Sequence, residues 1–126
     1  MNALLKAKSA YSVANAPTRT AKDFEFEVIA RITRKMISAA KSKGPNSFPA
    51  LAEALHDNRK MWNLFEIDVA SSENALPIEL KEQIFYLSAF TREHTSKVLS
   101  RKAGIKPLVE INTAIMRGLR SGASKP

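Results

Sequence analysis

The 126-residue chain has no cysteine, only four glycines, and few aromatic residues (7%). Without cysteine it forms no disulfide and no thiolate metal site, which excludes disulfide scaffolds, zinc fingers and thiol enzymes. No apolar run approaches the ~18 residues of a membrane span. Lys6 and Lys8 interrupt the apolar stretch that an export signal would need. We therefore expect a cytoplasmic protein that does not insert into membranes.

Strand patterns are also missing. No segment alternates strictly between apolar and polar residues, and β-branched residues do not cluster. Glycine and proline mark a few breaks, and helix-length segments lie between them. At 44% hydrophobic and 25% charged residues the composition is that of a globular protein. The sequence predicts an all-α fold, a small four- to five-helix bundle forming a single domain over residues 1–126.

Apolar residues recur at helical spacing in five segments. The predicted helices cover about residues 3–14, 20–43, 47–69, 77–98 and from 107 to Gly118 or Gly122. Residues 1–16 are expected to form an N-terminal arm and residues 120–126 a flexible tail. On the fourth helix, the stripe predicted to be buried is Leu80, Ile84, Leu87, Thr91 and Val98.

The formal net charge of +8 is concentrated at the two ends of the sequence. Residues 44–100 hold five basic and eight acidic side chains, whereas residues 1–43 hold nine and three, and residues 101–126 hold six and one. This pattern is compatible with a solvated surface or with contacts to a phosphate backbone. The residues that we would assign to such contacts are Arg31, Arg34, Lys35, Arg117 and Arg120.

The sequence offers little catalytic chemistry. His56 and His94 each stand beside a carboxylate, but adjacent residues on a helix point in different directions, so neither pair forms a base with its orienting group. No metal-ligand spacing, nucleophile motif or phosphate loop is present. We predict a protein that is not an enzyme, with no catalytic residue, metal, cofactor or small-molecule substrate.

Two asparagines interrupt apolar stripes, Asn58 on the third predicted helix and Asn112 on the fifth. A buried amide is costly unless it is hydrogen-bonded, so each is expected to hold a specific neighbour. One interpretation is a latch between helices, for example onto carbonyls near Leu76-Pro77. The other is direct contact with a partner. Trp62, four residues after Asn58, shares its face and is interpreted either as a core residue or as an interface residue.

Four motifs in order carry a resemblance to a known family. They are Asn58-Arg59 with Trp62; Asn74 with Leu76-Pro77; Phe90-Thr91 with Thr95 and Leu99; and the run from Pro107 to Asn112 with Ile115-Met116 and Gly118-Leu119. Together with Tyr11 and Ala14 near the start, they make nearly the whole chain similar to the flagellar biosynthesis regulator FlaF family.

This resemblance implies a non-enzymatic cytoplasmic factor needed for flagellin production, acting post-transcriptionally and in opposition to the repressor FlbT. It also implies direct handling of flagellin before export, in the manner of a secretion chaperone. The expected partners are therefore flagellin and, as a further candidate, FlbT.

We expect flagellin to bind a groove between helices lined by residues such as Leu55, Trp62, Leu87 and Ile115. The candidate partner-binding residues are Asn58, Arg59, Trp62, Leu87, Asn112, Ile115 and Met116. The alternative is a basic RNA-binding regulator that meets flagellin messenger RNA through the basic residues named above. Stacking aromatics interleaved with those residues are missing, which weighs against this alternative.

Overall fold

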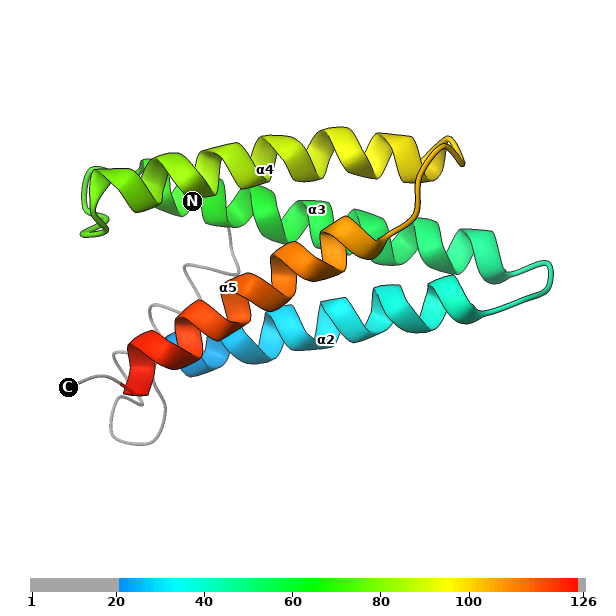
Figure 1. The fold of residues 1–126 in the computed structure, drawn as a ribbon, viewed down its shortest axis with the longest axis horizontal. Coiled ribbons are helices and arrows are strands. Elements are labelled where there is room, and N and C mark those ends of the chain that lie inside the picture. Colours follow the sequence, from blue (N-terminus) through cyan, green and yellow to red (C-terminus); the bar gives the residue numbers. More distant parts are fainter. Residues whose placement is uncertain (1–20, 125–126) are drawn as a thin grey trace.

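Four α-helices and no β-strand make up the part of the chain that the computed structural model describes, residues 21–124, with side chains described over 25–118 (Figure 1). They are α2 (Ala21–Lys41), α3 (Ser47–Ala70), α4 (Ile78–Leu99) and α5 (Lys106–Ser124). The all-α prediction is confirmed. The predicted helix over residues 3–14 and the N-terminal arm lie outside the described residues.

Helix boundaries follow the predicted breaks, with one error. Gly44 lies in the α2–α3 connection with a φ of 106°, a left-handed conformation that favours glycine. Pro77 stands just before α4, where its missing N–H costs no hydrogen bond. The error is in α5, which continues to Ser124 past Gly118, so residues 120–124 extend a helix that we expected to have ended. Glycine ends a helix when its backbone turns left-handed, and among the described glycines only Gly44 has a positive φ.

The helices form an unevenly closed bundle. α2 packs against both α3 and α5, and α4 packs against α3, whereas α4 and α5 make few contacts with each other. In Figure 1, α5 crosses α2 diagonally while α4 runs beside α3. The α2–α3 and α4–α5 connections lie together at one end of the bundle, and the α3–α4 connection lies at the other.

Each half of the bundle has its own apolar cluster. Near the α2–α3 and α4–α5 connections, which we call the closed end, the buried residues are Met36, Ala39, Ala54, Leu55, Val98 and Leu108. Toward the α3–α4 connection, which we call the open end, the buried residues are Ile29, Ile32, Met61 and Trp62.

Large exposed apolar side chains are confined to one stretch of the described chain. They lie between the last turn of α3 and the middle of α4, and they are Ile67, Leu76, Ile78, Leu80 and Tyr86. The prediction that Leu80 is buried is therefore wrong, because it is 45% exposed. Thr91 and Val98, further along the same stripe, are buried as predicted. The stripe is therefore exposed near the start of α4, at the open end, and buried further along the helix.

Candidate partner-binding site

A buried hydrogen-bonded network links three helices at the centre of the bundle. The Asn112 amide nitrogen (α5) donates to Asn58 Oδ1 (α3) at 2.8 Å and to Thr33 Oγ1 (α2) at 3.0 Å. The Asn112 amide oxygen accepts from Trp62 Nε1 at 2.9 Å. Thr33 in turn donates to the Ile29 carbonyl at 2.7 Å. All four side chains of the network are buried, so it fixes the register of α2, α3 and α5.

This geometry decides between the two interpretations of the asparagines. Asn58 and Asn112 latch helices together, although their partners are side chains and not carbonyls near Leu76-Pro77. Asn58 and Asn112 are 0% exposed, so the prediction that they contact a partner from the surface is wrong. Trp62 is 1% exposed but its ring lines a pocket at the open end, so its assignment to partner binding stays a prediction. The polar atoms of these three side chains bond one another inside the core, except for Asn58 Nδ2, which is buried and makes no hydrogen bond to the described residues.

A pocket of about 240 Å³ opens at the open end, where all four described helices contribute. One wall is the Trp62 ring, which meets the Phe65 ring edge-on, with centroids 5.6 Å apart and planes at 79°. The central network places this wall, because it fixes the tryptophan nitrogen on Asn112. The lining residues are Glu25, Ile29, Trp62, Phe65, Asp68, Val69, Asn74, Leu76, Ile84 and Ile115.

The α3–α4 connection forms an acidic and apolar rim to this pocket. The Asn74 side chain shapes it, accepting from the Leu76 N–H at 2.9 Å and donating to Asp68 Oδ2 at 3.3 Å. Residues 67–80 carry three carboxylates, Asp68, Glu73 and Glu79, and no basic side chain. The rim therefore combines apolar side chains with negative charge.

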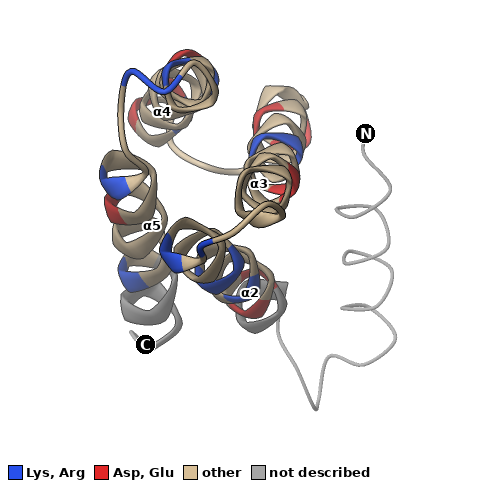
Figure 2. Ribbon diagram, turned by 90° about the vertical axis from the view of Figure 1, so that its right-hand side faces the viewer, with Lys and Arg blue, Asp and Glu red and all other residues tan. Residues whose placement is uncertain are grey.

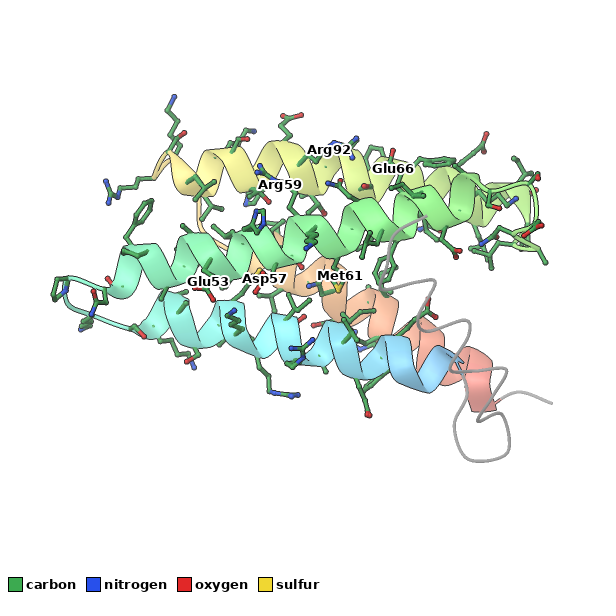
Figure 3. The ribbon with its side chains drawn as sticks, turned by 180° about the vertical axis from the view of Figure 1, so that it is seen from behind. Glu53, Asp57, Arg59, Met61, Glu66 and Arg92 are labelled. Carbon is green, nitrogen blue, oxygen red and sulfur yellow. The ribbon has the colours of Figure 1, made fainter. Side chains whose placement is uncertain are left out.

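Two ion-pair clusters tie neighbouring helices together (Figure 3). Between α3 and α4, Glu66 accepts from Arg92 at 2.6 Å and from Ser88 at 2.9 Å. The hydrogen bond from Arg92, supported by the one from Ser88, lowers the pKa of Glu66 despite partial desolvation. The negative charge of Glu66 is thus stabilised by α4.

Between α2 and α3, Lys35 donates to Asp57 at 2.7 Å and to Glu53 at 2.8 Å. These hydrogen bonds, to Asp57 first and then to Glu53, raise the pKa of Lys35. Lys35, which the sequence assigned to phosphate contacts, is paired with two carboxylates of α3.

The other predicted groove residues divide between the two ends. Leu87, Ile115 and Met116 are half-buried against the cluster of the open end, and Ile115 lines the pocket. Arg59 is half-buried on α3. The prediction that Leu55 lines the groove is wrong, because it is 0% exposed in the cluster of the closed end. Sequence reasoning missed the pocket residues Phe65, Val69 and Ile84 as a group, although the helical periodicity put each on an inward face.

The remaining predicted residues lie apart from the pocket. Arg31 and Arg34 are exposed on α2 and Arg117 is exposed on α5, while the side chain of Arg120 lies outside the described residues. The His94 Nε2 atom lies 2.8 Å from the Gly104 carbonyl oxygen, to which it donates, and its ring stacks on Phe90 at 5.5 Å. This histidine ties α4 to the α4–α5 connection.

Across residues 21–124 no group of three or more histidines and carboxylates is placed to hold a metal ion. Over the same range, no helix has both the length and the apolar composition required to cross a bilayer.

Comparison with known proteins gives one match. A family model described as flagellar protein FlaF matches residues 7–119, which is most of the chain. No curated protein and no solved structure matches it.

Proposed function

Because the chain belongs to the flagellar protein FlaF family, we propose that it regulates flagellin synthesis and flagellum assembly by binding flagellin. In this proposal it acts as a secretion-chaperone-like factor in the cytoplasm, where flagellin is made, and works post-transcriptionally in opposition to FlbT. Binding alone accounts for this role, so it needs no catalytic group or cofactor. The observation that best supports the proposal is the apolar pocket at the open end.

The size and shape of the pocket suit side chains of a client helix. At about 240 Å³ it is smaller than the ~300–1,000 Å³ of small-molecule sites. An amphipathic helix binds by inserting a few apolar anchors spaced three or four residues apart into such a groove. Ile84 lines the pocket, and the exposed Leu80, four residues earlier on α4, lies beside it on the same face of the helix. A client helix can therefore lie along this face with one anchor in the pocket.

The charge of the rim adds selectivity for the client. Asp68 lines the pocket, and Glu73 and Glu79 stand in or beside the α3–α4 connection. Opposite charges across an interface speed association and disfavour wrong partners. We therefore expect the bound flagellin helix to carry lysine or arginine beside its apolar anchors.

Size-exclusion chromatography with light scattering tests the proposal, using the purified protein alone and mixed with flagellin monomer at ~0.15 M salt, where long-range charge attraction is screened. The wild-type chain is expected to co-elute with flagellin at a defined stoichiometry. The Leu80→Glu variant should bind at least ten-fold more weakly, because it places a charge in the apolar mouth. Leu80 is already 45% exposed, so this change leaves the fold intact.

Tyr86→Glu is the matched control. Tyr86 is 69% exposed, and it lies two residues beyond Ile84, on another face of α4. The Tyr86→Glu variant should bind flagellin with the same affinity as the wild type. Absence of a complex with the wild type would reject flagellin as the direct partner, and equal binding by both variants would reject this surface.

A further inference from the structure

The closed end carries a group of basic side chains that flagellin binding at the opposite end does not use. Five of them are exposed there, from the end of α2, the two connections and the first residue of α5. They are Lys41, Lys43, Arg101, Lys102 and Lys106. Figure 2 looks onto this end and shows blue segments on α2, on α5 and in the connection that follows α4. We call these five residues the basic face.

The fold holds the α4–α5 connection of this face in place. Leu99, Ala103 and Ile105, which flank or belong to the α4–α5 connection, pack against the closed-end cluster. The Lys102 N–H donates to the Lys97 carbonyl at 2.8 Å, and the Arg101 N–H donates to the Val98 carbonyl at 2.9 Å, which caps α4. The positive charges are therefore presented on an anchored turn.

Arg101 is fixed in a particular orientation. Its backbone φ is 60°, a conformation that non-glycine residues seldom adopt. Its guanidinium lies 4.2 Å from the centroid of the ring of Phe48, in the first turn of α3. One face of the planar guanidinium is covered by the ring, and because Arg101 is exposed, the other is available to stack on a ligand.

None of the five side chains has a carboxylate partner among the described residues. The nearby acids are occupied or distant from the turn: Glu53 pairs with Lys35, and Glu93 lies 3.7 Å from Lys97. Only Glu110, one turn after Lys106 on α5, adds an acidic residue beside the face. The positive charge is therefore largely uncompensated.

The composition of the face selects one class of ligand. Every large exposed apolar side chain of the described residues lies between positions 67 and 86, so the basic face has none. Protein interfaces bury an apolar centre that is depleted in lysine, and membrane-binding surfaces insert apolar side chains. A face of lysines with one stacked arginine and no apolar centre instead suits phosphates along a strand and a base on the guanidinium.

We propose that the basic face of the closed end binds the phosphodiester backbone of a single-stranded nucleic acid. Its charges are spread over two connections and not gathered into one cavity, so the ligand is an extended strand and not a free phosphate. Contacts between lysine and phosphate depend on charge and not on the base sequence. Binding is therefore sequence-independent and weakens steeply with salt. This surface differs from the Arg31 and Arg34 face that the sequence suggested.

Fluorescence anisotropy with a labelled 20-nucleotide oligouridine tests the proposal at ~0.1 M salt. The Lys43→Glu/Lys102→Glu double variant should raise the Kd at least ten-fold. The control, Arg31→Glu/Arg34→Glu, changes the net charge equally on a different face and should raise it less than three-fold. Replacing Lys43 and Lys102 by glutamine should reduce the slope of log K against log salt by about 1.4, since each single-strand phosphate contact contributes about 0.7.

Three results would overturn the proposal. The first is absence of binding by the wild type, and the second is equal weakening by both double variants, which would assign binding to overall charge. The third is displacement of the RNA by polyglutamate at equal charge concentration, which would assign the face to acidic proteins. Circular dichroism verifies that each variant is folded. Co-elution of Lys43→Glu/Lys102→Glu with flagellin separates failure here from failure of the proposed function.

Discussion

The two ends of the bundle differ in how completely they are closed. At the closed end, the α4–α5 connection packs on a cluster in which Leu55 and Leu108 are 0% exposed, and the surface outside is basic. At the open end, α4 and α5 diverge around a pocket, the connection is acidic, and Leu76 and Leu80 face solvent. The same helices thus have one end that buries its apolar residues and another that exposes them.

Because of this difference, we expect the closed end to contribute mainly to folding stability and the open end mainly to binding a partner. Apolar area already removed from water stabilises the folded chain, whereas exposed apolar area stabilises a complex once a partner covers it. We therefore expect substitutions at the closed end to change unfolding more than binding of flagellin. Substitutions at the rim of the open end should do the reverse.

The largest expected effect is that of Leu55→Ala at the closed end. Removing a fully buried leucine side chain costs about 2–5 kcal/mol of folding free energy, because it loses burial and leaves a cavity. Leu80→Ala makes the same chemical change at a site that is 45% exposed. It should cost about 0.5 kcal/mol or less. Urea unfolding followed by circular dichroism measures both, and similar costs for the two variants would contradict the distinction between the ends.

The next effect concerns the network that lies between the two ends. Asn112→Ala removes three hydrogen bonds and leaves Trp62 Nε1 and Asn58 Oδ1 buried without that partner. We expect a loss of about 2–4 kcal/mol, since each unsatisfied buried polar group costs about 1–3 kcal/mol. Trp62 is the only tryptophan, so its fluorescence reports the change directly.

Asn63→Ala is the control for this variant. Asn63 lies next to Trp62 on α3 but is exposed, so its replacement should change stability by about 0.5 kcal/mol or less. An unchanged tryptophan emission spectrum in Asn112→Ala would mean that the bond from Trp62 contributes little to the wall of the pocket. The latch would then hold the helices without shaping the open end.

Much of the fold follows from local signals in the sequence. Gly44, Pro77 and the helical spacing of apolar residues gave the start of α3, the break before α4 and the all-α class. The end of α5 was mispredicted because Gly118 keeps a helical backbone, which composition does not reveal. Leu80 was mispredicted because periodicity gives the inward face of a helix but not whether a neighbouring helix covers it.

The candidate site was harder to predict for the same reason. Asn58 and Asn112 were singled out correctly as residues that hold specific neighbours, yet only their contacts show that these neighbours lie inside the core, where Asn112 also fixes the Trp62 wall of the pocket. The basic face was missed because Lys43 and Lys102 are 59 positions apart in the sequence and come to the same end through packing of the connections. Charge counted along a chain does not give charge on a surface.

The smallest expected effect on stability concerns the ion pair between Glu66 of α3 and Arg92 of α4. The pKa of Glu66 is lowered in the folded state, so its ion pair with Arg92 stabilises the chain above the ordinary value of 4.5 and is lost as the pH falls below it. Glu66→Gln should therefore lower stability by about 0.5 kcal/mol at neutral pH, since both side chains are partly exposed, and by progressively less below pH ~4.5. Glu93→Gln, whose Lys97 partner is 3.7 Å away, should have a smaller effect. Urea unfolding between pH 7 and pH ~3 measures both, and a pH-independent effect of Glu66→Gln would show that packing, not charge, holds α4 against α3.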